Sequence, residues 1–177
     1  MEQLIVISAV GGDRTGVVHD LTQIIMDCGG SIKDSRMTTL GEEFAMLLLV
    51  SGNCHSVSRM EQDLTRFADD KGLVIQLKRT QPKQPSKELL PYAIEIVCLD
   101  QLGIVHNLAG FFAGHSIEIV EVTTRSYPAA HTGTTMFSVQ MFINIPAAIH
   151  IAVLREEFME FCDRLNLDAI MEPVKNT

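Results

Sequence analysis

Residues 13–21 read DRTGVVHDL, and residues 100–108 read DQLGIVHNL, 87 positions further along the chain (from 13 to 100). The equivalence extends past this stretch, since Asp34 corresponds to Glu121 at the same separation. Self-similarity at a fixed period is typical of a duplicated folding unit. The sequence therefore predicts that its 177 residues hold two copies of one small domain.

A polar, proline-bearing segment separates the two copies. Residues 81–90 read QPKQPSKELL, a composition that favours a short extended linker. The predicted first domain covers residues 1–80, and the predicted second domain covers residues 91–177. Lysine and arginine gather in residues 78–87 without interleaved aromatic side chains, so a solvated tether is favoured over a nucleic-acid contact.

Both copies show the same order of expected elements. In the first copy, apolar residues at helical spacing begin at Val17 and stop at Gly29 and Gly30, which are typical of a helix end. Around this helix the patterns predict strands at 4–10, 31–40, 43–50 and 73–78 and a second helix at 57–67. In the second copy they predict strands at 93–99, 117–126, 134–145 and 167–174 and helices at 103–114 and 151–165.

The βαββαβ order predicts an α+β fold class with two tandem ferredoxin-like units. Each unit is expected to carry its helices on one face of an antiparallel sheet. Small sheets of this kind have edge strands and one open face, and native proteins usually cover such edges. Pairing of edges within the chain, packing of the sheets and formation of a homodimer all remain open as ways to cover them.

Composition and charge argue against several classes of partner. The net charge of −8 opposes binding to DNA, so no direct nucleic-acid contact is expected. The N-terminus has no basic segment, and the apolar runs are far shorter than the roughly 20 residues that span a bilayer, so a cytoplasmic protein without membrane contact is expected. The cysteines are scattered without a C-x-x-C pair and are interpreted as reduced, mostly buried thiols: Cys28, Cys54, Cys98 and Cys162.

Familiar catalytic and metal-binding patterns are missing from the sequence. It contains no H-x-x-x-H or H-E-x-x-H pair, no nucleophile elbow and no phosphate-binding glycine loop, so we predict no enzyme, no cofactor and no metal site. His19 and His106 occupy equivalent positions, where ordinary packing or solvation is favoured over pH sensing or ligand contact. Glu42 and Glu43 are interpreted as a solvated hairpin tip.

The loop before the first helix of each copy is the best candidate for ligand binding. A glycine at a helix start permits close approach to the backbone, and the free N–H groups and helix dipole attract a carboxylate. An acidic side chain would accept the ammonium group of an amino acid. The candidate ligand residues are Asp13, Arg14, Thr15, Gly16, Val17, Val18 and Asp34 in the first copy and Asp100, Gln101, Leu102, Gly103, Ile104 and Glu121 in the second.

Two simpler interpretations stand beside this one. Asp13 or Thr15 would serve as an ordinary helix cap, with the glycine merely permitting the turn, and the local pattern alone favours that. If only one loop binds a ligand, the first is favoured because Arg14 and Thr15 are more polar than Gln101 and Leu102. Residues 127–133 form an insertion in the second hairpin, which is either a partner surface or, as is favoured, a tolerated loop.

The chain also resembles a known family in the duplicated D-x-x-G-[VI]-V loop and in three further segments. These are residues 32–36 (IKDSR), 40–44 (LGEEF) and 119–125 (IVEVTTR). Together they resemble the tandem ACT-domain repressors of the glycine cleavage system. The resemblance implies ACT-type units that sense amino acids, and binding to a LysR-type activator protein that glycine or a related small amino acid relieves. An amino-acid-sensing module that acts on a metabolic enzyme is the alternative.

Overall fold

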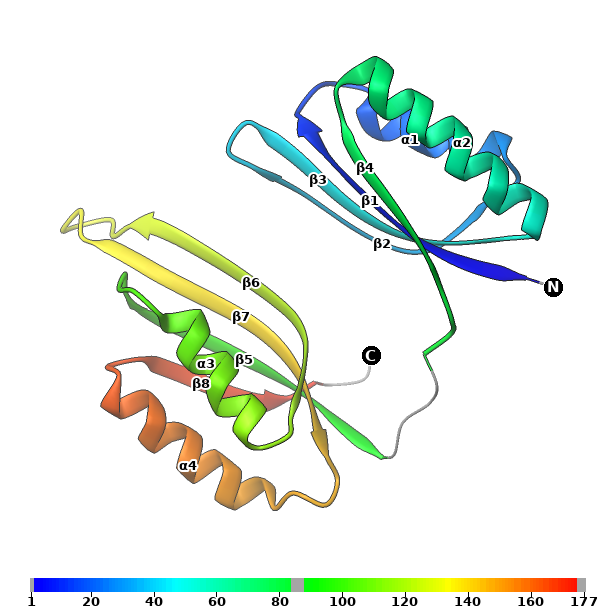
Figure 1. Cartoon of the computed structure of the whole chain (residues 1–177). Helices are drawn as coiled ribbons and strands as arrows, with labels where there is room; N and C mark the ends of the chain where they lie inside the picture. Colours follow the sequence, from blue (N-terminus) through cyan, green and yellow to red (C-terminus); the bar gives the residue numbers. More distant parts are fainter. Residues whose placement is uncertain (1, 84–87, 175–177) are drawn as a thin grey trace. The chain divides into compact units, whose positions relative to one another are not determined.

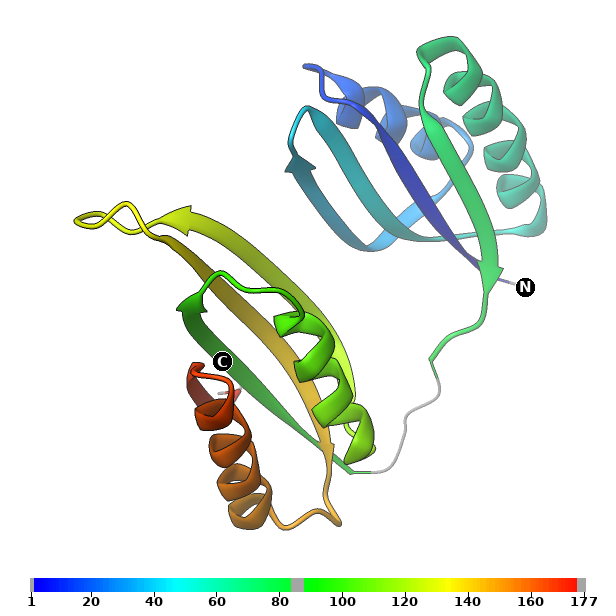
Figure 2. The ribbon, with the colours of Figure 1, turned by 60° about the vertical axis from the view of Figure 1, so that its left-hand side comes forward.

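The computed structural model describes residues 2–83 and 88–174. The chain forms two compact units, Met1–Gln84 and Pro85–Thr177. In each unit two helices cover one face of a four-stranded antiparallel sheet, and the other face of the sheet carries no helix (Figures 1 and 2). The predicted linker lies partly outside the described residues, at 84–87.

The first unit has the expected βαββαβ order. Its elements are β1 (Gln3–Gly12), α1 (Val17–Asp27), β2 (Ser31–Leu40), β3 (Glu43–Gly52), α2 (Cys54–Lys71) and β4 (Val74–Thr80). The strands lie in the order β2-β3-β1-β4, so β2 and β4 are the edges. All ten residues of β2 are exposed.

The second unit repeats this topology with a separate core. Its elements are β5 (Leu89–Leu99), α3 (Ile104–Gly114), β6 (Glu118–Pro128), β7 (Thr135–Pro146), α4 (Ile151–Arg164) and β8 (Asp168–Pro173), in the strand order β6-β7-β5-β8. Phe112 and Phe158 pack with ring centroids 5.4 Å apart in this core. The core of the first unit contains mainly aliphatic side chains and methionine, with Cys28 and one buried phenylalanine, Phe44, and Phe67 packs against it. The fold class predicted from the sequence is confirmed.

Local sequence signals explain several helix boundaries. Helix α1 ends at Cys28, and the following Gly29 adopts a positive φ of 78° while its N–H bonds the carbonyl of Met26. Helix α2 is capped at its N-terminus by Asn53, whose side-chain oxygen accepts a hydrogen bond from the N–H of Ser56 at 2.8 Å. These are the positions where glycine and asparagine satisfy backbone groups that a helix end leaves unpaired.

Two predicted boundaries of the second unit were wrong. Strand β5 begins at Leu89 rather than at residue 93, because residues 89–92 continue the ladder with β7, and the carbonyl of Pro91 still accepts a bond from Val174. Tyr127 and Pro128 belong to β6 rather than to the inserted loop, since they pair with Met136 and Thr135. Proline is tolerated here because β6 is an edge strand.

Both edge strands β2 and β6 contain the same irregularity. The register of β2 against β3 shifts between Ile32 and Asp34, and that of β6 against β7 shifts between Ile119 and Glu121. One extra residue therefore lies in each edge strand, as in a β-bulge.

The open faces of the two sheets differ in chemistry. In the first unit the positions along the central strands and two positions beside them are largely apolar: Val6, Val10, Ala45, Leu47, Leu49 and Val74, with Ser8 and Thr38. At the equivalent positions of the second unit lie Ala93, Val97, Ser138, Gln140, Phe142 and Asp168, with Glu95 and Arg125. The edge strands of the first unit add Asp34, Arg36, Gln76 and Lys78 to its open face. The two faces thus differ most along the central strands, which are mainly apolar in the first unit and mixed in the second.

Candidate ligand-binding site

The loops before α1 and α3 have the same backbone geometry. Gly16 has φ 92° and ψ −8°, and Gly103 has φ 86° and ψ 6°, so both lie in the left-handed region. Side chains other than glycine are strained in this region. The D-x-x-G pattern therefore corresponds to one recurrent turn that delivers the chain into a helix.

Gly16 is the N-terminal cap residue of α1, and Gly103 is the N-terminal cap residue of α3. Neither helix has a side-chain hydrogen bond at its cap, so Asp13 and Thr15 do not cap α1. The N–H groups of a first helical turn have no partner within the helix, and the positive end of the dipole lies beside them. This arrangement leaves both loops able to bind a carboxylate.

Each loop is anchored to the neighbouring hairpin by its aspartate. The backbone N–H of Asp13 donates to the carbonyl of Glu42 at 3.0 Å, and that of Asp100 donates to the carbonyl of Thr135 at 3.0 Å. The start of each loop is therefore held by its backbone, whereas the aspartate side chains are exposed.

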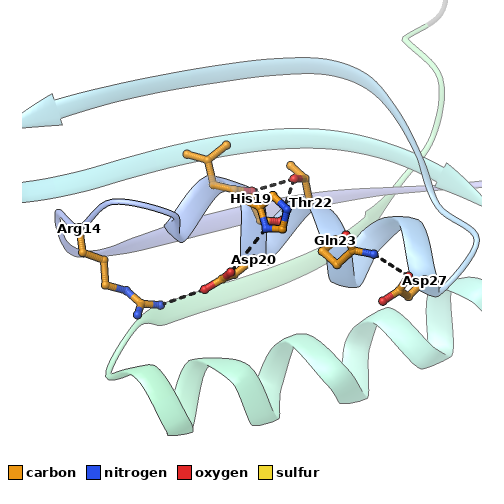
Figure 3. A network of polar contacts seen from close by, with 7 residues as sticks. Arg14, His19, Asp20, Thr22, Gln23 and Asp27 are labelled. Atoms are coloured by element: carbon orange, nitrogen blue, oxygen red, sulfur yellow. Dashed lines mark hydrogen bonds and ion pairs between the residues drawn. The ribbon is translucent and has the colours of Figure 1, made fainter.

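A small charged network belongs to the first loop (Figure 3). Arg14 reaches forward to Asp20 in the first turn of α1, with 3.7 Å between the guanidinium and the carboxylate, and His19 lies 3.7 Å from the same carboxylate. Both partners of the Arg14–Asp20 pair are about two-fifths exposed, 40% and 44%. Exposed pairs of this kind contribute little, so Arg14 is free to turn toward an anionic ligand.

Two side chains of the second loop already form hydrogen bonds within the protein. The Asp100 carboxylate accepts a hydrogen bond from the Ser126 hydroxyl at 3.2 Å, and the Gln101 amide donates to the carbonyl of Leu165 at 3.0 Å. Leu102 is fully exposed. Within residues 2–83 and 88–174, by contrast, no hydrogen bond or ion pair engages the Asp13 carboxylate.

The sheet register separates Asp34 and Glu121 from the loops of their own units. Asp34 pairs with Leu49, which pairs with Val6, seven residues before Asp13. At about 3.3 Å per residue this places Asp34 roughly 23 Å from the loop. Glu121 stands in the same relation to Asp100, through Phe142 and Ala93. The first unit therefore brings residues 13–18 together but leaves Asp34 far from them. The second unit brings residues 100–104 together but leaves Glu121 far from them.

Asp34 has a local role within β2. Its carboxylate accepts hydrogen bonds from the N–H of Ser35 at 2.8 Å and from the Arg36 guanidinium at 2.6 Å. Both residues lie on the exposed edge strand. An exposed carboxylate held by its own strand is available to a ligand only if Arg36 is displaced or shared.

The sequence did not indicate one polar contact between α3 and α4. His115 Nε2 lies 2.8 Å from a carboxylate oxygen of Glu157, and Nδ1 lies 2.8 Å from the carbonyl of Phe111. The backbone bond to Phe111 and the carboxylate of Glu157 raise the pKa of His115 above its ordinary value. His19 and His106, which the sequence singled out, are exposed.

The thiols divide into one exposed and three buried groups. Cys54 is exposed at the start of α2, whereas Cys28, Cys98 and Cys162 are buried. Burial raises the pKa of all three, that of Cys162 to about 12, and the Asp63 carboxylate raises that of Cys28 further. In the described part of the chain no cluster of three metal-ligating side chains occurs. No described helix is both long and apolar enough to cross a membrane.

Comparison with known proteins shows similarity to one domain family and to one named repressor. Residues 3–78 match the model of the ACT domain. The glycine cleavage system transcriptional repressor of Escherichia coli strain K12 is 29% identical over 167 residues, which is 93% of this chain and 87% of that protein.

Two crystal structures share the whole two-unit chain. One, provisionally assigned as a glycine cleavage system transcriptional repressor, is 26% identical, covers 99% of both chains and superposes with a TM-score of 0.73. The other, from Galdieria sulphuraria, is 27% identical, covers 99% of this chain and 100% of that one, and gives a TM-score of 0.82. The chain therefore has a tandem ACT fold, and it is similar along nearly its whole length to glycine cleavage system transcriptional repressors.

Proposed function

We propose that this chain is a cytoplasmic, non-catalytic regulator that represses glycine cleavage genes by binding a LysR-type activator, and that glycine relieves the repression. The observation that carries the proposal is the similarity to a named repressor across both units, 93% of the chain. The net charge of −8 also favours a protein partner over direct contact with DNA.

Glycine is proposed to bind at the first loop. Its carboxylate would meet the free N–H groups at the start of α1 and the Arg14 guanidinium, and its ammonium group would meet the Asp13 carboxylate. The unengaged state of Asp13 supports the first loop over the second, where Ser126 already holds Asp100. Asp34 and Glu121 remain candidates only if a neighbouring ACT unit brings one of them to a loop, because their own unit does not.

The effect of glycine on repression requires different affinity for two states of the protein. A coupling free energy of about 1.4 kcal/mol changes the affinity for the partner tenfold. One charge-assisted contact that forms in only one state is of this size. A small ligand is therefore sufficient to release a partner.

Calorimetric titration with glycine, serine and alanine tests the ligand. We expect glycine to bind, and Asp13→Ala to weaken it by about tenfold through loss of the ammonium acceptor. Asp69→Ala makes the same charge change on an exposed position of α2 and serves as the control. Undiminished binding to Asp13→Ala would exclude the first loop, and failure of all three amino acids to bind would exclude direct sensing.

Capture of partners from a lysate of the source cells tests the proposed binding to a LysR-type activator. Recovery of a LysR-type activator, released by added glycine, is the expected result. Recovery of a metabolic enzyme instead would favour the alternative, an amino-acid-sensing module of that enzyme. In a gel-shift assay we expect the chain alone to leave operator DNA unshifted and to alter only the complex with the activator.

A further inference from the structure

The open face of the second sheet contains a cavity of about 340 Å³. Strands β5, β6 and β7 supply its walls, and no residue of the loop before α3 takes part. The lining residues with polar side chains are Glu95, Thr123, Thr124, Arg125, Ser138 and Gln140. A cavity of this size is at the lower end of the range for small-molecule sites, so it suits a metabolite rather than a larger ligand.

The strand register places the polar groups in two adjacent rows. Thr123 lies opposite Gln140, which lies opposite Glu95. In the next row Arg125 lies opposite Ser138. Residues two apart on a strand point to the same face, so all five side chains belong to the open face.

Three of these side chains have no polar partner in the part of the chain that the structure describes. Among the residues that the structure describes, no hydrogen bond or ion pair engages the side chains of Glu95, Arg125 or Gln140. The Ser138 hydroxyl donates to the backbone carbonyl of Arg125 at 3.3 Å, which leaves the guanidinium available.

Charged groups around two other cavities are already neutralised. In the cavity at the end of β1 and β4, Lys33 pairs with Glu2 at 3.6 Å. Arg79 in the same cavity forms two hydrogen bonds to Glu61, at 2.9 and 3.0 Å. The smaller hollow beside β2 holds Asp34, which is bonded by Arg36.

The spacing of the two charges leaves room for a ligand between them. Strand β7 separates β5 from β6, so Glu95 and Arg125 are about 10 Å apart across the sheet and about 7 Å apart along it. Their Cα atoms are thus roughly 12 Å apart, and side chains that stand upright on the sheet do not meet at this distance. Both can reach a molecule that lies over Gln140 and Ser138.

The fold does not require these groups. The first unit has Ser8 at the position of Glu95, Leu47 at the position of Gln140 and Thr38 at the position of Arg125. The same topology therefore forms without a carboxylate, an amide or a guanidinium at these three positions. The first copy has an arginine in the adjacent row, Arg36 at the position of Thr123, but this arginine is bonded to Asp34.

We propose that the open face of the second sheet is a binding site for a small zwitterion, with Glu95 accepting its ammonium group and Arg125 binding its carboxylate. A planar guanidinium suits a carboxylate, which it can bind through two parallel hydrogen bonds. Gln140 offers both a donor and an acceptor to the middle of the ligand. The site is distinct from the loop at Gly16 and does not depend on glycine binding there.

Amide-resolved NMR of the whole chain tests this site separately from the loop. The ligands are glycine, β-alanine and 4-aminobutyrate, whose charges are increasingly far apart, with acetate and methylammonium as single-charge controls. We expect at least one zwitterion to give saturable shifts at the amides of Thr124, Val139 and Gln140. Acetate and methylammonium lack one of the two charges and should bind about tenfold more weakly or not at all.

Substitutions of Glu95 and Arg125 test which side chain binds each charged group of the zwitterion. Glu95→Gln and Arg125→Gln should each lower the affinity for the zwitterion about tenfold, because each removes one charge-assisted contact. The matched controls Glu156→Gln and Arg164→Gln change exposed residues of α4 and should leave the affinity unchanged. A dispersed amide spectrum for each variant shows that it is folded.

Two results would overturn the proposal. In one, no zwitterion gives saturable shifts at the cavity amides, whether or not shifts occur at Gly16 and Val17. In the other, the shifts are equal for zwitterions and single-charge ions or survive both charge substitutions. Shifts at Gly16 and Val17 alone would leave the loop site intact while excluding this one.

Discussion

Gly16 and Gly103 share a backbone conformation, and the space around them also matches. A Cβ added at Gly16 meets nothing within 4 Å, and one added at Gly103 meets only Asn107 at 3.7 Å. Neither glycine is therefore required by crowding. Glycine is favoured at both positions by the left-handed φ of the turn, which starts each helix without a side-chain cap.

Gly16→Ala should therefore lower the free energy of unfolding of the first unit by about 1 kcal/mol, the cost of a left-handed alanine. Urea unfolding followed by circular dichroism measures it. Gly12→Ala is the control, because Gly12 also has free space for a Cβ but no positive φ. An equal loss in both variants would show that backbone strain is not the cause.

His115 gives the second unit a stability that depends on pH. Its pKa is raised in the folded protein by Phe111 and Glu157, so its contribution is fully present below the pKa of the unfolded histidine, about 6.5. The contribution is lost as the pH rises through the higher folded pKa. Since Glu157 is 52% exposed, solvent screening keeps the effect small.

Glu157→Gln should lower the free energy of unfolding by about 0.5 kcal/mol near pH 5.5 and by much less near pH 8.5. Thermal unfolding at the two pH values measures the difference. Glu156→Gln on the same helix is the control, and it should show no such dependence. A Glu157→Gln effect that is the same at both pH values would contradict the assignment.

Single positions differed in how far the sequence could predict them. The D-x-x-G glycines were predictable, because the requirement for a left-handed turn is local and appears twice. The contact of His115 with Glu157 was not, since 42 residues separate the partners and only the packing of α3 on α4 brings them together. The set of Glu95, Arg125 and Gln140 likewise depends on a strand register that the sequence pattern does not specify.

At the scale of elements, the helices and strands were predicted in type and order, and errors fell at their ends. Periodicity is strong inside an element, whereas an end depends on where pairing with a neighbour stops. Strand β5 gained residues 89–92 because β7 continues alongside them. The inserted loop is shorter than predicted because Tyr127 and Pro128 pair with residues of β7.

Packing of the elements also decides thiol reactivity. We expect an aromatic disulfide reagent to label Cys54 rapidly at about pH 8 and the other cysteines slowly, because burial both covers Cys28, Cys98 and Cys162 and raises their pKa. The release of coloured thiolate measures the rates. Cys54→Ser should remove the rapid phase, and Cys162→Ser should leave it unchanged.

At the scale of the whole molecule, two self-contained cores share one topology. The buried residues of one cluster all lie in the first unit and those of the other all lie in the second. Leu64 in α2 is 0% exposed and Leu154 in α4 is 2% exposed, so each is a core position of its own unit. Each unit therefore has a hydrophobic core of its own.

Leu64→Ala should destabilise the first unit by about 2–5 kcal/mol, the usual cost of a cavity in a core. Hydrogen exchange followed by mass spectrometry should show faster exchange in β1 and β3 and unchanged exchange in β5 and β7. Leu154→Ala should give the reverse pattern. Equal acceleration in both units after either substitution would show that they unfold together.

The register shift that recurs in β2 and β6 has a consequence for solubility. A regular, exposed edge strand can recruit further copies of itself without limit, and this is how ordered protein fibres grow. The extra residue near Asp34 and near Glu121 interrupts the even spacing of backbone donors and acceptors that such growth needs. Because the interruption was duplicated with the domain, both bulged edges resist fibre growth while the rest of each strand stays open to a specific neighbour.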